Sequence, residues 1–380
     1  MIKKTTILLI ICLFLTSCSK KEELKNGKYN KYFSNGRVRL TQTFKNNKLH
    51  GETVEFYDSG EEKSITTYIN GYKNGTYQQF YRSGVLHSEG YFQADKMEGE
   101  VRGYYENGVL KGVVTMKKGK TNGPFVEYYP NEVKRVEGEF INDEKNGLIT
   151  EYYETGEVQS TKEYEKGQLA GVVKQFYKNG NLKSIIGYRD GMRQGVLKIN
   201  FPDGSLASLR TFKDGKLHGY SRDYHPNGEW KVVRYYVNGN LDGEYREFYP
   251  SGQMKYRALY VDGQRIGTAV SYREDGTVKA EGEYKRDMLD GQTVMYSPDG
   301  EVVYEAQFRE DTLAGISTEY FSDGMPKTTV EISEDKLTTM VKDFYPDGTL
   351  KQERYFELGD LKSRRKYNPD GTLVPESIKR

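Results

Sequence analysis

The sequence predicts an all-β fold of tandem 24-residue β-hairpin repeats, about 14 to 15 of them, forming an elongated antiparallel meander or solenoid-like sheet. Three observations predict this fold. One glycine recurs every 24 residues along almost the whole chain, and a second glycine follows with the same period. The segments between them are rich in Val, Ile, Thr, Tyr and Phe, which strands favour. Two strands and two turns fit this period, whereas a helical pair usually needs more than about 30 residues.

The first glycine ladder marks a turn. Its glycine follows pairs such as Pro202-Asp203 and Pro226-Asn227. Pro presets the first turn position and glycine supplies a positive φ, so we expect a three-residue hairpin made of a type I turn and a glycine bulge. In this register Glu55 faces Lys63, Phe56 faces Glu62, and Tyr57 faces Glu61. The turn glycines are Gly36, Gly60, Gly84, Gly108, Gly156, Gly180, Gly204, Gly228, Gly252, Gly276, Gly300, Gly324 and Gly348.

The second glycine ladder runs from Gly51 to Gly315 and then gives way to Thr339 and Ser363. We interpret it as part of a second corner, which in one repeat runs from Lys213 to Gly219. The third residue of this corner is always Gly, Asn or Asp, which tolerate a left-handed backbone. We expect the terminal units, where the ladder fails, to cap the array.

Side-chain alternation divides the sheet into two faces. The positions of Phe56, Glu62 and Tyr68 are mostly aromatic, apolar and aromatic in the other copies, so we expect them to share the packed face. The positions of Glu55 and Lys63 are mostly acidic and basic, which predicts a wet face with cross-strand ion pairs. A row of partly exposed tyrosines on the wet face is a possible binding surface: Tyr57, Tyr81, Tyr105, Tyr129, Tyr153, Tyr177 and Tyr249.

Departures from the repeat are candidate specificity residues. Glu132 replaces a turn glycine after Asn131, and Asn200 replaces a packed aromatic residue. Arg273 and Ser297 replace tyrosines of the row. Trp230 is the strongest candidate for a contact residue, because tryptophan is enriched at binding hot spots, although its position in the repeat predicts burial.

Composition indicates a thin core and a neutral surface. Hydrophobic residues make up 36% of the chain, and aromatic residues make up 13%, with 33 Tyr. The 57 basic and 55 acidic residues leave a net charge of +2, which falls to zero if a leader carrying Lys3 and Lys4 is removed. Nucleic-acid binding is therefore not expected. The basic stretch from Lys362 to Lys366 is interpreted as a solvated terminal segment, with an acidic partner as the alternative.

Catalytic chemistry has no candidate residues. His50 and His218 occupy one repeat position, and no cluster of His, Cys or carboxylates has metal-ligand spacing. The recurring Pro-Asp-Gly turns bring one carboxylate each, too few for calcium. We predict no enzymatic activity, no catalytic residue, no cofactor and no metal site.

The N-terminus carries a targeting signal. Lys3 and Lys4 precede an apolar run, Ile7 to Leu15, that ends in Leu15-Thr16-Ser17-Cys18. This resembles the lipobox of bacterial lipoproteins, which implies cleavage before Cys18 and lipidation of its thiol. The expected organisation is a signal peptide (1–17), lipidated Cys18 with a linker (18–27), the repeat array (28–373) and a tail (374–380). Localisation would be the bacterial cell envelope, and the outer membrane, on its periplasmic or surface side, in a Gram-negative cell. An ordinary secretory leader is the alternative.

The repeat resembles a known family. Gly171 to Lys183 reads Gly-x-x-x-x-Phe-Tyr-x-x-Gly-x-Leu-Lys, which is similar to the bacterial variant of the MORN repeat. Gly147 to Gln159 follows the same pattern except at its last two residues. The resemblance covers residues 28–373 and extends to the YwqK-family antitoxins. It implies a scaffold that binds proteins or membranes, and in the antitoxin case it implies toxin binding.

Three functional hypotheses follow. The first is a membrane-anchored, non-enzymatic repeat scaffold for protein–protein interaction, because repeat arrays build extended surfaces. The second is binding of cell-wall or surface glycans through the tyrosine row. The third is an antitoxin or immunity-like protein that neutralises an envelope-acting toxin. An enzyme hidden in one divergent unit is a remaining alternative.

Overall fold

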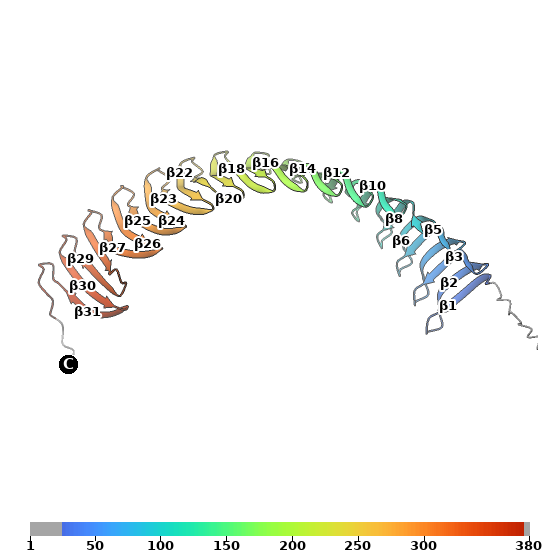
Figure 1. The fold of residues 1–380 in the computed structure, drawn as a ribbon, viewed down its shortest axis with the longest axis horizontal. Coiled ribbons are helices and arrows are strands. Elements are labelled where there is room, and N and C mark those ends of the chain that lie inside the picture. Colours follow the sequence, from blue (N-terminus) through green and yellow to red (C-terminus); the bar gives the residue numbers. More distant parts are fainter. Residues whose placement is uncertain (1–24, 376–380) are drawn as a thin grey trace, which may run out of the picture. The chain divides into compact units, whose positions relative to one another are not determined.

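The computed structural model describes residues 25–375, which form 31 β-strands and no helix (Figure 1). The expected all-β fold of tandem antiparallel hairpins is confirmed. The chain divides into two compact units, one ending at Glu132 and the other beginning at Val133. Within each unit, strands pair antiparallel in chain order, and each of two short strands shares its partner with the strand that follows it, so each unit is an antiparallel meander. Cys18 and the signal peptide lie outside the described residues.

The first unit contains ten strands. Their bounds are β1 (Gly27–Tyr32), β2 (Val38–Lys45), β3 (Lys48–Phe56), β4 (Glu62–Ile69), β5 (Tyr72–Phe80), β6 (Leu86–Gln93), β7 (Lys96–Met97), β8 (Gly99–Tyr104), β9 (Leu110–Lys117) and β10 (Lys120–Tyr128).

The second unit contains the remaining strands. Their bounds are β11 (Lys134–Ile141), β12 (Glu144–Tyr152), β13 (Val158–Glu165), β14 (Gln168–Phe176), β15 (Leu182–Arg189), β16 (Met192–Asn200), β17 (Leu206–Lys213), β18 (Lys216–Tyr224), β19 (Trp230–Val237), β20 (Asn240–Leu241), β21 (Gly243–Phe248), β22 (Met254–Val261), β23 (Gln264–Tyr272), β24 (Val278–Lys285), β25 (Met288–Tyr296), β26 (Val302–Arg309), β27 (Thr312–Tyr320), β28 (Pro326–Ile332), β29 (Thr338–Phe344), β30 (Leu350–Glu357) and β31 (Asp360–Lys366).

The first glycine ladder forms the expected three-residue turn. Between β3 and β4 the Gly60 N–H donates to the Tyr57 carbonyl at 3.0 Å, and the Tyr57 N–H donates to the Glu61 carbonyl at 2.8 Å. Phe56 pairs with Glu62 as predicted. Gly60 has a φ of 108°, and Glu132 adopts the same left-handed backbone with a φ of 67°. The sequence change at Glu132 therefore leaves the turn intact and places a strained residue in it.

The predicted pairing of Glu55 with Lys63 is wrong by one residue. Glu55 pairs with Ser64, and Lys63 is an extra residue in a β-bulge. The Lys63 Nζ still reaches the Glu55 Oε1 at 3.1 Å, so the expected ion pair forms without direct strand pairing.

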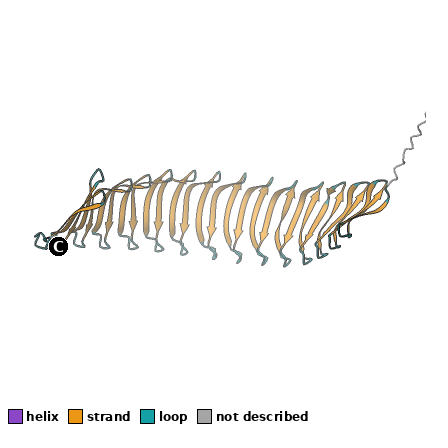
Figure 2. Cartoon of the chain, turned by 90° about the horizontal axis from the view of Figure 1, so that it is seen from below, coloured by secondary structure: helices purple, strands orange, loops and turns teal. Residues whose placement is uncertain are grey.

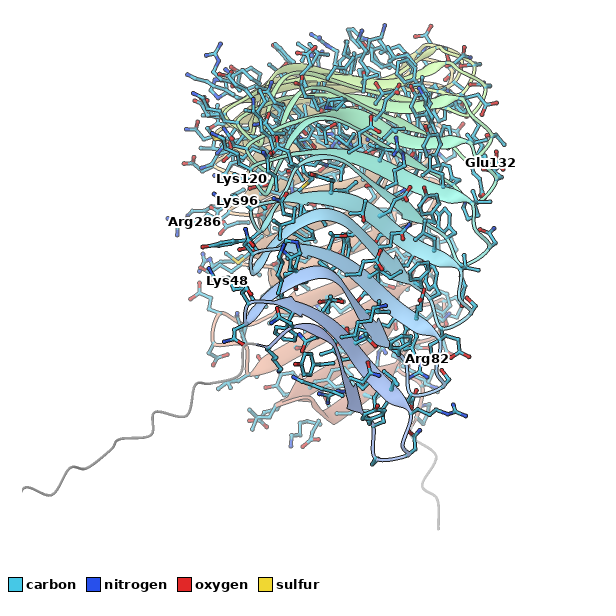
Figure 3. The ribbon with its side chains drawn as sticks, turned by 90° about the vertical axis from the view of Figure 1, so that its right-hand side faces the viewer. Lys48, Arg82, Lys96, Lys120, Glu132 and Arg286 are labelled. Carbon is cyan, nitrogen blue, oxygen red and sulfur yellow. The ribbon has the colours of Figure 1, made fainter. Side chains whose placement is uncertain are left out.

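The second corner is shorter than expected. It is a two-residue type I′ turn, in which Asn46 and Asn47 have φ values of 53° and 64°. In the repeat used as the example, the turn is Asp214-Gly215, and Gly219 lies inside β18. The two kinds of turn line opposite edges of each unit (Figure 2). In the first unit, Lys48, Lys96 and Lys120 follow two-residue turns on one edge, and Arg82 and Glu132 lie in three-residue turns on the other (Figure 3).

The second glycine ladder therefore marks a bulge within a strand. Gly51 pairs with Tyr68, Gly195 with Phe212, and Gly219 with Tyr236, so these glycines lie opposite aromatic residues. Gly99 and Gly315 lie opposite Met116 and Ile332 instead. A Cβ on Gly75 would meet the Thr67 Cβ at 2.8 Å. The ladder fails at Thr339 for a structural reason: β28 and β29 pair without a register shift. Their connection is a longer turn closed by the Ser333 N–H donating to the Thr338 carbonyl at 3.0 Å.

The extra residue at each three-residue turn overturns part of the face assignment. Beyond Lys63 the alternation of side chains shifts by one, so Tyr68 lies on the face opposite Phe56 and Glu62. In the second unit the equivalent face carries Ile149, Ile186 and Phe212, and in each unit this face is called the core face below. The face of Phe56, Phe80 and Tyr104 is the more exposed one, although these three rings are half-buried, and it is called the open face.

The core face holds most of the buried apolar side chains. Val173, Ile186 and Phe212 form a cluster against which Leu169 and Leu217 pack. Ile149 is 0% exposed, whereas the preceding Leu148, on the open face, is 54% exposed. Val233, Val270 and Val294 are buried on the open face. Each unit is thus one layer of sheet with a thin core along one side.

The last strand is an exposed edge, which accounts for the basic C-terminal stretch. Every residue of β31 is exposed, including Lys362, Arg364 and Lys366, and Val374 N–H bonds to the Lys366 carbonyl at 2.8 Å just before Pro375. Charged residues and proline on an edge strand oppose pairing with another chain.

We predict that Gly75→Ala destabilises the protein more than Gly108→Ala. Both glycines have positive φ, which costs a residue with a Cβ about 1–2 kcal/mol. A Cβ meets nothing within 4 Å at Gly108 but clashes with Thr67 at Gly75. Thermal unfolding monitored by circular dichroism measures both variants. Equal losses, or a larger loss at Gly108, would contradict the assignment of Gly75 to a closed bulge.

Candidate binding surface

The predicted tyrosine row joins neighbouring repeats. The Tyr57 hydroxyl donates to the Phe80 carbonyl at 2.8 Å, and the Tyr153 hydroxyl donates to the Phe176 carbonyl at 2.8 Å. The same bond, with lengths between 2.7 and 2.9 Å, is made by Tyr81, Tyr105, Tyr177 and Tyr249. Tyr129 is half-buried at the equivalent position. The row lies on the core face, beside the three-residue turns, and its hydroxyl groups are occupied.

Residues that replace these tyrosines show what the position requires. The His225 Nε2 lies 3.0 Å from the Phe248 carbonyl oxygen, and the Arg273 guanidinium donates to the Tyr296 carbonyl. Each supplies a polar hydrogen in place of the hydroxyl. Phe33, Phe201 and Phe321 cannot supply one, and the Ser297 hydroxyl oxygen instead accepts from the Glu301 N–H within its own turn at 3.1 Å. The row of bonds is therefore interrupted at these repeats.

A second set of tyrosines bridges strands on the open face. The hydroxyl groups of Tyr104 and Tyr296 donate to Glu89 at 2.7 Å and Glu281 at 2.6 Å. The hydrogen bond that the Tyr296 hydroxyl donates to Glu281 raises the pKa of Tyr296 to about 12, and burial and the negative charge of Glu281 act in the same direction. Both tyrosines occupy the position that Phe56 has in its repeat. Their hydrogen bonds to the adjacent strand hold the rings against the open face, where they are half-buried.

Ion pairs run along the core face. Lys162 lies 2.7 Å from Glu151, and Arg354 lies 2.9 Å from Asp343, in both cases across adjacent strands. Arg234 pairs with Asp223 in the same way. Burial raises the pKa of Glu151, but hydrogen bonds from Lys162 and Ser160 outweigh it and hold the pKa below the ordinary value of 4.5. The wet, salt-bridged surface that the sequence predicts is therefore part of the core face.

Trp230 is more exposed than its repeat position predicts. It is 44% exposed on the open face, with its ring 5.8 Å from the ring of Phe248. The expected burial is wrong because the bulge places this position on the exposed side of the sheet. Asn200, by contrast, is buried, and its Nδ2 donates to the Leu182 carbonyl at 3.0 Å.

The open face carries a patch that the sequence reasoning missed. Val196 and Tyr220 are 53% and 50% exposed, and with Leu148 and Val172 they fill the same position in four consecutive repeats. Two residues after three of them come the basic residues Lys174, Lys198 and Arg222. Reading each repeat position along the array would have found both rows. We call these seven residues the Leu148–Arg222 patch.

Two hollows lie on the core face of the second unit. A small one of about 120 Å³ is lined by residues that include Tyr153, Lys162 and Lys183. A larger one of about 540 Å³ lies near the last strand, lined by residues that include Phe321, Tyr345, Lys351, Lys366 and Tyr367. Lys351 lies 5.5 Å from the Tyr345 ring centre. Because Phe321 lacks a hydroxyl, the Phe344 carbonyl beside this hollow accepts no hydrogen bond of the kind that the Tyr57 hydroxyl donates to the Phe80 carbonyl.

The part of the chain that the structure describes holds no group of three or more His, Cys, Asp or Glu side chains placed to bind a metal ion. His50 and His218 are inside the sheet, and their Nδ1 atoms are buried. Residues 25–375 contain no helix that is long and apolar enough to span a membrane.

We predict that Tyr153→Phe lowers the free energy of unfolding by about 0.5–1.5 kcal/mol, because it removes one inter-repeat hydrogen bond. The reciprocal variant, Phe201→Tyr, restores the hydroxyl where the ladder is interrupted and should raise stability. Urea denaturation of both variants checks the pair. Unchanged stability in both would show that the ladder does not hold the repeats together.

We predict that the stabilising contribution of Glu151 depends on pH. Its folded pKa lies below the ordinary value of 4.5, so the contribution is present above that value and is lost as pH falls through the folded pKa. Glu151→Gln should therefore destabilise the protein at pH 7, and the difference from wild type should disappear in acid. Denaturant unfolding across this range measures it. A constant difference at every pH would contradict the prediction.

Comparison with known proteins identifies the repeat. The MORN repeat variant family matches residues 73–94, 97–118, 145–166, 169–190, 241–262 and 339–358, and the MORN repeat family matches 281–302. Together these segments cover fewer than half of the residues. The first match, 73–94, begins within β5 and ends at a two-residue turn, so it spans two strands and the three-residue turn between them.

Solved structures give a weaker likeness. TcdB2-TccC3-Cdc42 matches with a TM-score of 0.14 and 10% identity, over 90% of this chain and 24% of that one. TcdB2-TccC3-TEV has a TM-score of 0.16 and 13% identity, over 91% and 23%. The Photorhabdus luminescens Tc holotoxin pore has a TM-score of 0.15 and 13% identity, over 91% of this chain and 22% of that one. This chain spans less than a quarter of each. No curated protein matches. The family matches support a protein built of MORN-type repeats.

Proposed function

We propose that this protein is a membrane-anchored, non-enzymatic repeat scaffold that binds another protein. The observation that carries the proposal is the single-layer architecture of each unit, which leaves most side chains of the open face accessible. An extended surface of this kind suits binding of a partner across several repeats. The antitoxin role implied by the YwqK-family resemblance is the special case in which the partner is a toxin.

Affinity capture tests this proposal. The full chain, kept in detergent, serves as bait for solubilised envelope proteins, and the same chain unfolded by heat is the control. We expect one protein to be retained in stoichiometric amount by the folded chain only. Retention of polysaccharide without protein would contradict the scaffold.

We further propose that Cys18 carries the lipid anchor. The support is the lipobox-like sequence from Leu15 to Cys18. Cells fed labelled palmitate should incorporate label into the wild-type chain and not into Cys18→Ser, and the variant should leave the membrane fraction, because acyl chains add about 0.8 kcal/mol of membrane affinity per buried methylene. Equal labelling of the two chains would contradict lipidation at Cys18.

Binding of an acidic saccharide is a second candidate function, which the larger hollow near β31 favours. Lys351 and Lys366 line it together with Tyr345, so ammonium groups and an aromatic ring lie close enough to hold one charged sugar. The tyrosine row itself is less suited, because its hydroxyl groups are occupied. Calorimetry with oligogalacturonate should show binding that Lys351→Ala abolishes and Lys183→Ala, in the smaller hollow, does not. No heat of binding would exclude this site.

A further inference from the structure

We propose that the Leu148–Arg222 patch binds an extended acidic segment of a partner protein, with an apolar side chain at every third residue. This inference rests on the proposed scaffold function and assigns both the docking surface and the chemistry of its occupant. The patch lies wholly within the second unit, on the open face of β12, β14, β16 and β18.

The apolar row of the patch is too exposed to form part of the hydrophobic core. Leu148, Val196 and Tyr220 are each at least half exposed, although Ile149, one residue along, is fully buried on the other face. Tyr220 contacts Tyr235 with ring centres 5.0 Å apart, which extends the apolar surface across the neighbouring strand. Apolar side chains in register over consecutive repeats form a continuous stripe, which is typical of an interaction surface.

The basic row of the patch is not neutralised. None of Lys174, Lys198 and Arg222 forms an ion pair with a carboxylate of the described residues, and Arg222 instead lies 5.0 Å from the Tyr220 ring centre. The nearest acidic residue on this face beside Leu148 is Glu163, and its Oε2 already accepts the Val172 N–H at 3.2 Å. A partner that brings carboxylates would find unpaired cations along the stripe.

Other repeats show that the patch is not a requirement of the array. At the same two positions, Arg102 pairs with Glu100, and Arg246 pairs with Glu244 at 3.5 Å. In the patch an apolar residue stands where those glutamates stand, which exposes the cation and adds an apolar contact. The stripe ends at Glu244 in the next repeat, and Thr268 and Gln292 occupy the apolar position farther along the chain.

The spacing of the rows selects an extended partner. Equivalent residues in consecutive repeats are two strands apart, which is about 9.6 Å. A polyproline II helix repeats every three residues and rises about 3.1 Å per residue, so its side chains recur every 9.3 Å. Two turns of an α-helix, seven residues, span about 10.5 Å, which is longer than the spacing between repeats. The difference between the two lengths accumulates over four repeats. The occupant therefore has apolar and acidic residues with a period of three.

Fluorescence anisotropy with a designed probe tests the proposal. The probe is a fluorescein-labelled peptide, (Pro-Leu-Glu)₄, and the protein is the full chain in detergent. We expect saturable binding that weakens at least about tenfold in Lys174→Glu/Lys198→Glu, because two attractive charges become repulsive. The matched control, Lys231→Glu/Lys279→Glu, makes the same charge change at the Lys63 position of two other repeats and should bind within about twofold of wild type.

Three further probes separate the alternatives. (Pro-Leu-Lys)₄ should not bind, (Pro-Ser-Glu)₄ should bind more weakly, and (Pro-Leu-Glu-Glu)₃ should lose affinity through its period of four. Equal binding of (Pro-Leu-Glu)₄ to both double variants would overturn the proposal. Binding of phosphatidylserine vesicles without binding of (Pro-Leu-Glu)₄ would also overturn it. A protein captured equally by wild type and Lys174→Glu/Lys198→Glu would leave the scaffold function standing and refute this site.

Discussion

A one-layer sheet has no second layer to cover it, and this constraint determines the rest of the structure. Its cohesion must come from contacts between neighbouring strands at the edges and along one thin core. The bulge next to each two-residue turn frees a backbone carbonyl, which accepts a hydrogen bond from an N–H of the two-residue turn in the next repeat. One example is the Gly71 N–H, which donates to the Leu49 carbonyl at 2.8 Å. At the opposite edge, the bulge at Lys63 is accompanied by the tyrosine bond to the following repeat. Both edges are thus joined along the array.

This constraint explains the unusual composition. A globular core would need Leu, Ile and Val, whereas a strand-to-strand joint needs a ring that covers backbone and a hydroxyl that reaches a carbonyl. Tyrosine supplies both, and the chain contains 33 of them. The glycines of the bulges stand opposite many of these rings, as Gly51 pairs with Tyr68. Aromatic residues and bulge glycines therefore recur together with the period of the repeat.

Much of the fold could be predicted from period and turn chemistry, because Gly60 and the Pro-Asp pairs act locally. The faces could not, because one unpaired residue at Lys63 reverses the alternation, and pairing register is not a local property. For that reason the repeat pattern alone groups Tyr68 with Phe56 and predicts burial of Trp230, and the structure contradicts both. The Leu148–Arg222 patch was missed because each residue in it is ordinary by itself. Only its repetition on an exposed face gives it meaning, and exposure depends on the register.

Each repeat packs against its neighbours along the chain, so stability should be approximately a sum over repeats. Deleting one whole internal repeat, residues 265–288, tests this most directly, since Gln264 would then continue into Leu289 at the same position of the next repeat. Circular dichroism with thermal unfolding is the measurement. We expect an undiminished β-sheet signal per residue and a small decrease in melting temperature. Loss of the fold would contradict it, because it would require a core shared across the array.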